Sequence, residues 1–149
     1  MDVQERAKDF VRRTLDAMGI PLEIAVSEEP DSIRINLSGE QGEVLLRRRA
    51  EALDALQHIV NTAFRRELKD DRTFVVDCLD YRRTKDAEVR RMAQHLMERA
   101  KSTGMAQEIG PLNPYARRLV HLTVAEDGEL SSESIGDAFL KTVVISVRR

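Results

Sequence analysis

The residues best suited to bind a charged ligand lie in one short stretch, which reads Asn-Pro-Tyr-Ala-Arg-Arg-Leu-Val-His-Leu over residues 113–122. Asn113 is a good helix N-cap and Pro114 suits the first helical position, so the pattern predicts a helix that begins here. On that helix Arg117 and His121 stand four residues apart and share one face. An arginine and a histidine side by side near a helix start could hold an anion, most naturally a phosphate.

The spacing alone also permits an interpretation without a ligand. A surface arginine beside a histidine that caps an internal group is common at this spacing. Tyr115 is equally open, because its ring can offer a stacking face or pack into the core. Leu119 and Leu122 are expected to point away from the Arg-His face and to be buried.

The stretch is similar to the signature of the R-three-H domain, which is named for an Arg and a His separated by three residues. Domains of that family are associated with single-stranded nucleic acid. The resemblance therefore implies that Arg117 holds phosphate, that His121 bonds to phosphate or sugar, and that Tyr115 offers a stacking face. Arg118 and Asn113 complete the nucleic-acid-binding set expected on this helix.

Before that helix, the chain predicts two further helices among short strands. Residues 2–18 are expected to form an amphipathic helix, which begins at Asp2 and stops at Gly19. Alternating stretches at residues 22–26 and 33–37 predict a hairpin with one apolar face. A second helix is expected from the arginine triplet to about residue 66. A strand at residues 72–79 should follow, with Cys78 as an inert core thiol.

This order of helix, strand, strand, helix and strand resembles the KH-like region of the bacterial Jag family (SpoIIIJ-associated proteins). The likeness to that family covers the chain from about residue 1 to residue 147. Jag proteins often carry a further N-terminal segment, which we expect this chain to lack. The family has a GXXG loop before the second helix, and here Arg47 and Ala50 occupy the places of the two glycines.

The loss of those glycines changes what the loop can do. A GXXG loop holds nucleic acid because bare glycine lets phosphates approach the backbone. Arg47, Arg48 and Arg49 add charge while their side chains and Ala50 obstruct that approach. We expect weak, nonspecific phosphate contact here, and the alternative is a scaffold or protein-contact unit.

The second half predicts a helix-plus-sheet unit. A helix is expected from about residue 82 to residue 101, with Met92 on its buried stripe, and a short strand at residues 105–109 should follow. After the Arg-His helix, strands are expected at residues 130–135 and 142–147. The predicted fold class is α+β with two small fused modules. They are a KH-like domain at residues 1–80 and an R-three-H domain at residues 81–149.

Composition agrees with a small folded protein and limits its location. The chain has 149 residues, of which 42% are hydrophobic and 34% charged, enough for one ordinary domain or two very small ones. No apolar run reaches the roughly 18 residues of a membrane span, and the N-terminal residues are charged throughout, so we expect neither a transmembrane segment nor a secretory signal. A single Cys78 fits a reducing cytoplasm.

The charge pattern is compatible with nucleic acid without requiring it. The formal net charge is -2, which excludes a protein coated in positive potential. Arginine dominates the 24 basic residues and comes in clusters, and arginine contacts phosphate and stacks on bases better than lysine does. A genome that prefers arginine would produce the same bias.

No catalytic motif is present, so we expect a binding protein and not an enzyme. The chain has no Walker-type loop, no G-x-G-x-x-G and no paired cysteines, and its three histidines are too scattered for a metal site. No cofactor is expected. The predicted function is binding of single-stranded RNA or, less favoured, single-stranded DNA. The competing hypothesis, implied by the resemblance, is an adaptor for a small KH-domain protein or a membrane insertase.

Overall fold

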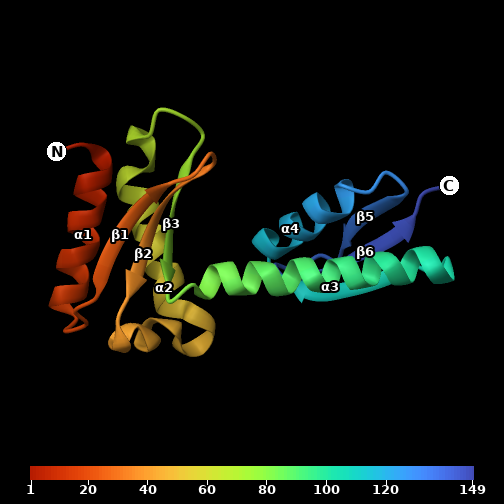
Figure 1. The fold of residues 1–149 in the computed structure, drawn as a ribbon, viewed down its shortest axis with the longest axis horizontal. Coiled ribbons are helices and arrows are strands. Elements are labelled where there is room, and N and C mark those ends of the chain that lie inside the picture. The colour runs from red at the N-terminus through yellow and green to blue at the C-terminus, as the bar shows by residue number, and fades with distance from the viewer. The chain divides into compact units, whose positions relative to one another are not determined.

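The computed structural model describes residues 1–149, and the chain divides into two compact units, Met1–Arg82 and Arg83–Arg149. Each unit contains one three-stranded sheet with helices packed on it (Figure 1). The elements in chain order are α1 (Val3–Ala17), β1 (Glu23–Glu28), β2 (Ser32–Ser38), η1 (Glu40–Gly42), α2 (Glu43–Phe64), η2 (Arg65–Glu67), β3 (Thr73–Cys78), α3 (Tyr81–Thr103), β4 (Gln107–Leu112), α4 (Pro114–Ala125), β5 (Leu130–Ile135) and β6 (Lys141–Val147). The predicted α+β class with two small modules is confirmed.

The first helix begins and ends where local signals predict. The Asp2 side chain accepts a hydrogen bond from the Glu5 backbone N–H at 2.8 Å, which satisfies one of the free donors at the helix start. After α1 the chain turns at Gly19, whose φ of 72° lies in the left-handed region that glycine tolerates best. One stripe of the helix is buried, and it consists of Ala7, Val11 and Leu15.

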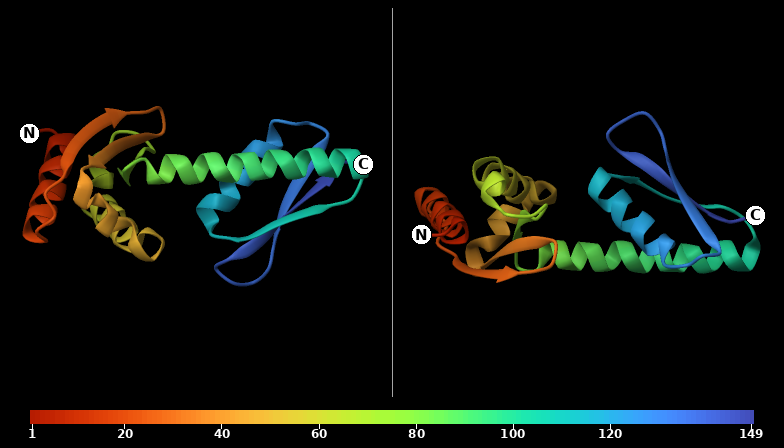
Figure 2. Two further views of the ribbon diagram at one scale, coloured as in Figure 1. Left: turned by 60° about the horizontal axis from the view of Figure 1, so that its bottom comes forward. Right: turned by 90° about the horizontal axis from the view of Figure 1, so that it is seen from above.

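The sheet of the first unit has the order β1-β2-β3, with β2 antiparallel to β1 and parallel to β3. Parallel strands cannot be joined by a tight turn, and α2 supplies the crossover between β2 and β3. Helices α1 and α2 lie against the same face of this sheet (Figure 2). Alternate strand residues fill the space beneath them, including Ile24, Ile33, Ile35, Leu37, Phe74, Val76 and Cys78.

An ion pair is buried between neighbouring strands of this sheet. Arg34 on β2 donates from Nη2 to Oδ2 of Asp77 on β3 at 2.7 Å, and both side chains are buried. The other oxygen of Asp77 accepts from the backbone N–H groups of Cys78 and Arg82. Asp77 therefore joins the middle of the sheet to the first turn of α3 through one carboxylate.

Helix α2 differs from the prediction at its start. Helix is present from Glu43 onward, so the predicted start at the arginine triplet is wrong, and Leu45 is buried on the helical turn that precedes the triplet. Residues 47–50 then leave helical geometry, and the helix resumes after them. Hydrophobic periodicity could not show this interruption, because Leu45, Leu53 and Leu56 all face the same core on both sides of it.

The second unit has a fully antiparallel sheet of order β4-β6-β5. Its core joins α3, α4 and one face of the sheet. Helix α3 contributes alanines to that core, Ala93 and Ala100, whose small side chains allow close packing. The remaining buried members are Ile109, Val120, Val124, Leu130, Val143 and Ile145.

Two hydrophobic residues expected in the core of this unit are exposed. Met92 is 55% exposed and Leu122 is 56% exposed, so both burial predictions are wrong. Ala93 and Ala100 on α3 and Leu119 on α4 are buried. Met92 and Leu122 thus lie at the edges of buried stripes whose other members face the core. The strand expected from residue 105 begins two residues later, at Gln107.

No helix in the chain combines the length and the apolar character that crossing a membrane would require.

Gly42 provides a stability test of the first core. A Cβ at this position would lie 2.8 Å from Cys78 Sγ, which is fully buried and cannot move aside easily. We expect Gly42→Ala to lower the free energy of unfolding by about 1–3 kcal/mol, the usual cost of overpacking, as measured by urea denaturation. Gly128→Ala is the matched control, because no atom lies within 4 Å of its new Cβ. Equal midpoints for the two variants would contradict the tight contact.

Candidate functional site

Helix α4 begins as the sequence predicts. The Asn113 side chain accepts a hydrogen bond from the Ala116 backbone N–H at 2.8 Å, and Pro114 occupies the first turn. The Asn113 amide is thereby occupied with capping the helix, so its oxygen serves structure and not a ligand. From this start the helix carries Arg117, Arg118 and His121 in its first two turns.

Both ring nitrogens of His121 bond to side chains of β5. Nδ1 lies 2.6 Å from the Ser132 hydroxyl oxygen and Nε2 lies 2.8 Å from that of Ser134. In the β5–β6 register these serines stand opposite Ile145 and Val143, which are fully buried, so they occupy the core-facing side of β5. A serine hydroxyl can donate or accept, so a neutral imidazole satisfies both partners at once.

This environment favours the neutral form of His121. Burial lowers the pKa of the imidazole below its usual value, and the nearby positive charge of Arg117 lowers it further. Near neutral pH the ring is therefore uncharged and has no free N–H to offer a phosphate. His121 thus bonds to internal groups, as the interpretation without a ligand expects, and its hydrogen bonds hold α4 against β5.

Arg117 forms a hydrogen bond within the second unit, whereas the Arg118 side chain has no partner. The Nη2 group of Arg117 donates to the Phe139 carbonyl oxygen at 3.3 Å, which links α4 to the turn between β5 and β6. The Arg117 Nε is buried without a hydrogen-bond partner. Arg118 is exposed and forms neither a hydrogen bond nor an ion pair. Of the two adjacent arginines, Arg118 is the cation more available to an anion.

A hollow of about 430 Å³, here called the α4 hollow, lies beside these residues. It is lined by Pro114, Arg117, Arg118, His121, Leu122, Ala125 and Ser134. Three of the predicted residues therefore border one concave surface. Tyr115 is 62% exposed and its hydroxyl donates to Asp86 on α3 at 2.9 Å, so the ring is neither core nor freely mobile.

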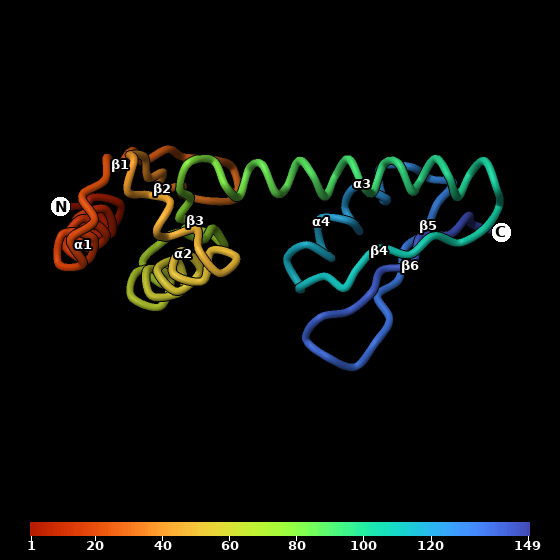
Figure 3. The backbone as a smooth tube through the Cα atoms, turned by 90° about the horizontal axis from the view of Figure 1, so that it is seen from below, coloured from red at the N-terminus to blue at the C-terminus, as the bar shows by residue number.

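Sequence reasoning missed Phe139. This residue lies in the turn between β5 and β6, is 73% exposed, and has its carbonyl bonded to Arg117. Figure 3 shows the chain between β5 and β6 as a wide loop. Turns are usually polar, so the Phe-Leu pair that follows Gly136 and Asp137 is an unusual turn composition, and this pair could have indicated the residue from the sequence.

The remaining predicted residues lie in the first unit. Arg47, Arg48 and Arg49 are exposed and border the interruption of α2, while Ala50 is buried. Arg48, Arg49 and Ala50 all have positive φ, at 54°, 58° and 62°. The backbone at this loop is left-handed, as glycine would favour, although no glycine is present.

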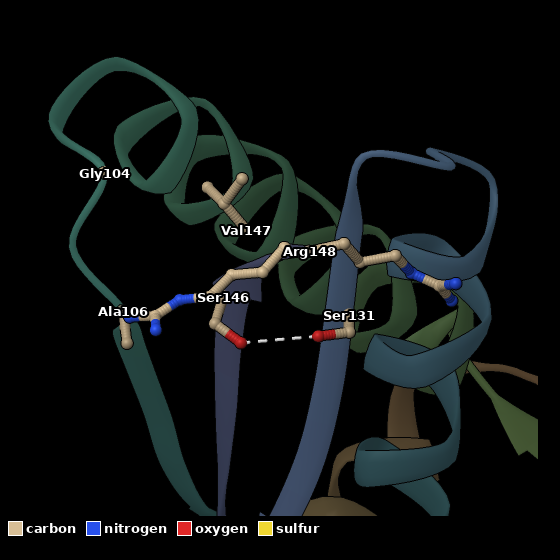
Figure 4. A pocket seen from close by; sticks show the side chains of 7 residues that line it. Gly104, Ala106, Ser131, Ser146, Val147 and Arg148 are labelled. Atoms are coloured by element: carbon tan, nitrogen blue, oxygen red, sulfur yellow. Dashed lines mark hydrogen bonds between the residues drawn. The ribbon is translucent and has the colours of Figure 1, made fainter.

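A second hollow in the second unit lies on the side of its sheet that faces away from the core (Figure 4). It has a volume of about 650 Å³ and is lined by Gly104, Ala106, Ser131, Ser146, Val147, Arg148 and Arg149. Ser131 and Ser146 bond to each other at 3.3 Å. Arg148 extends across β5 and donates from Nε to the Leu130 carbonyl. The two serines are thus paired with each other, whereas Arg149 is exposed and, like Arg118, forms neither a side-chain hydrogen bond nor an ion pair.

The structure contains no group of three or more His, Cys, Asp or Glu side chains arranged to hold a metal ion.

Comparison with known families finds a likeness for the second half of the chain. Residues 87–146 match the family model of the R-three-H domain, the domain predicted from the sequence. Over this stretch the chain is similar to R-three-H domains. The matched span includes all of α4 and β5 and nearly all of β6, so the α4 hollow and the Phe139 turn lie within it.

Relatives extend the likeness over the whole chain. RNA-binding protein KhpB of Clostridium symbiosum is 27% identical over 149 residues, which is 99% of this chain and 67% of that protein. The protein of the same name from Bacillus subtilis is 22% identical over 151 residues, covering 100% and 73%. That from Lactiplantibacillus plantarum is 20% identical, covering 95% and 44%. The resemblance to the Jag family is confirmed, while the KH-like interpretation of the first unit stays a prediction.

The lowered pKa of His121 predicts a pH-dependent loss of stability. The unfolded chain binds the proton at about pH 6.5, above the folded-state pKa. The contribution of His121 is therefore complete above about pH 6.5 and declines as the pH falls through that value. We expect His121→Gln to flatten the curve of unfolding free energy between about pH 7 and pH 5. His58→Gln, at an exposed histidine, is the control, and parallel curves for His121→Gln and wild type would contradict the assignment.

The backbone angles of the left-handed loop predict that glycine is stabilising at position 49 and destabilising at position 47. Arg49→Gly should raise the free energy of unfolding by about 1 kcal/mol, because a side chain at positive φ is strained. Arg47 has a φ of −63° and a ψ of 152°, so Arg47→Gly should instead lower it by about 0.5–1 kcal/mol through chain entropy. Thermal denaturation of the two variants tests the difference in sign. Destabilisation by both would show that the loop is unstrained.

Proposed function

We propose that this chain binds single-stranded RNA, without catalysing a reaction, through the face of α4 that carries Arg117 and Arg118. The observation that supports this most directly is the match to the R-three-H domain, because it covers the helix on which an unpaired arginine borders a hollow. Three relatives that align with nearly the whole chain are named RNA-binding proteins. Single-stranded DNA is the less favoured ligand.

Arg118 is the proposed primary phosphate contact. It is exposed and unpaired, so binding would not break an existing interaction. A guanidinium group can form two parallel hydrogen bonds to phosphate oxygens. The positive end of the helix dipole lies one turn away, which further favours an anion. Arg117 would add charge at the rim while it holds the Phe139 turn in place.

His121 has a positioning role in this proposal. Its nitrogens are engaged by Ser132 and Ser134, so it fixes α4 against β5 and thereby the direction in which Arg117 and Arg118 project. A phosphate that bonded to His121 would first have to displace a serine. Within the Arg-xxx-His pair, Arg117 would thus add charge at the rim and His121 would orient the helix, while the neighbouring Arg118 would make the primary contact with the ligand.

The first unit would add weak contact of low specificity. We interpret it as a KH-like domain, whose exposed Arg47, Arg48 and Arg49 can attract phosphate at the left-handed loop. Their side chains and Cβ atoms prevent the close backbone approach that a glycine loop allows. A buried, unpaired Cys78 supports a cytoplasmic location.

Arg118→Ala tests the proposed phosphate contact. We expect it to weaken binding of a mixed-sequence single-stranded RNA by about 1.5–3 kcal/mol, the range of a hydrogen bond to a charged group. It should also reduce the slope of log affinity against log salt by about 1. Fluorescence anisotropy across a salt series measures both quantities. Because Arg118 has no internal partner, the melting temperature should not change.

Arg12→Ala is the matched control, since Arg12 is an exposed arginine on α1 in the other unit. Similar losses for Arg12→Ala and Arg118→Ala would mean that binding follows net charge and not this site. If the unaltered chain fails to bind RNA even at low salt, the RNA proposal is wrong, and an adaptor role with a small KH-domain protein or a membrane insertase becomes the better hypothesis.

A further inference from the structure

We propose that the α4 hollow and the adjacent Phe139 form a nucleobase-binding site, in which Phe139 stacks on a base of single-stranded RNA. The inference rests on the proposed RNA binding and goes further, because it assigns the hollow to bases and leaves the phosphates to Arg117 and Arg118 at its rim. The site would favour an unpaired strand, since a base inside a duplex cannot present its face to a side chain.

The chemistry of the hollow favours a base over a phosphate. Pro114, Leu122 and Ala125 contribute apolar surface, and Leu122 remains 56% exposed. Both nitrogens of His121 are bonded to serines, so this residue can offer ring carbon surface but no free donor. A phosphate would find its hydrogen-bond donors at Arg117 and Arg118 on the rim, and the apolar surface of the hollow would offer it none. A flat aromatic ring would cover the apolar surface instead.

Phe139 is held where such a ring could reach it. The Phe139 carbonyl accepts from Arg117, and Arg117 also lines the hollow. The turn lies beside the N-terminal part of α4 in both views that show it clearly (Figures 2 and 3). Phe139 is 73% exposed. A phenylalanine left in water at a turn fixed by an arginine is a poor arrangement for stability and a suitable one for stacking.

The charges around the site select the partner. Arg118 is unpaired, and Arg117 keeps a buried Nε without a partner at the edge of the same surface. An apolar surface flanked by two guanidinium groups suits a ligand that alternates flat rings with anionic groups, as single-stranded RNA does. Asp137 in the turn is the one acidic residue between β5 and Phe139, and it would keep phosphates to the arginine side.

The test compares an ordinary single-stranded oligonucleotide with one of equal length that contains abasic residues. We expect Phe139→Ala to weaken binding of the ordinary strand about 5- to 100-fold, the range of one lost base–aromatic stack, and to leave binding of the abasic strand unchanged. Phe139→Trp should preserve binding of the ordinary strand. Met92→Ala, which removes an exposed apolar side chain on α3, is the control and should alter neither.

The outcomes separate this inference from the proposed function. If the wild-type chain binds ordinary and abasic strands equally and Phe139→Ala changes neither, RNA binding stands and the base site is wrong. If Phe139→Ala weakens both strands equally, the ring acts on the shape of the turn and not by stacking on a base, because alanine keeps the carbonyl that accepts from Arg117, and this result also overturns the base site. If the wild-type chain binds no RNA at low salt, the proposed function and the base site fail together, and the exposed apolar surface would then point to a protein partner.

Discussion

The neutral imidazole of His121 holds together the surface on which the proposed site depends. Its two ring nitrogens form hydrogen bonds with Ser132 and Ser134, which lie on the core-facing side of the edge strand β5. Aliphatic side chains would ordinarily occupy these positions and complete the core. The interaction fixes both the distance of α4 from β5 and its rotation. Arg117 makes the second link, to the Phe139 carbonyl. With the helix held at two points, Arg118 projects outward, and the unpaired guanidinium needs no rearrangement before it meets an anion.

In the first unit, buried apolar residues and not side-chain hydrogen bonds hold a surface loop in place. Its sheet is covered on one face by α1 and α2, and the Arg34–Asp77 pair is buried between β2 and β3. The interruption of α2 is anchored by Leu45 and Ala50, which are buried on either side of the three exposed arginines. The core therefore holds three residues at positive φ without the help of glycine. The loop keeps the backbone shape but presents charged side chains in place of bare peptide.

Local signals predicted much of the fold, and tertiary contacts account for most of what they missed. The caps at Asp2 and Asn113 could be read directly, because a side chain and a backbone group a few residues away determine them. The interruption of α2, the partners of His121 and the position of Phe139 could not. Each depends on residues distant in the chain, as Ser132 and Ser134 are from His121. The error at Leu122 has the same origin, since its exposure follows from how α4 is rotated over the sheet.

The close fit between Gly42 and Cys78 has a consequence for how the first unit can be observed. Burial raises the pKa of the Cys78 thiol to about 11, helped by the negative charge of Asp77, so almost no thiolate exists at neutral pH. The Cys78 side chain is also fully buried, with its Sγ 3.5 Å from the Gly42 carbonyl oxygen. Reaction of this single cysteine with a thiol reagent therefore requires the core to open first. The rate at which Cys78 is modified therefore reports how often the core of the first unit opens, and no label has to be introduced.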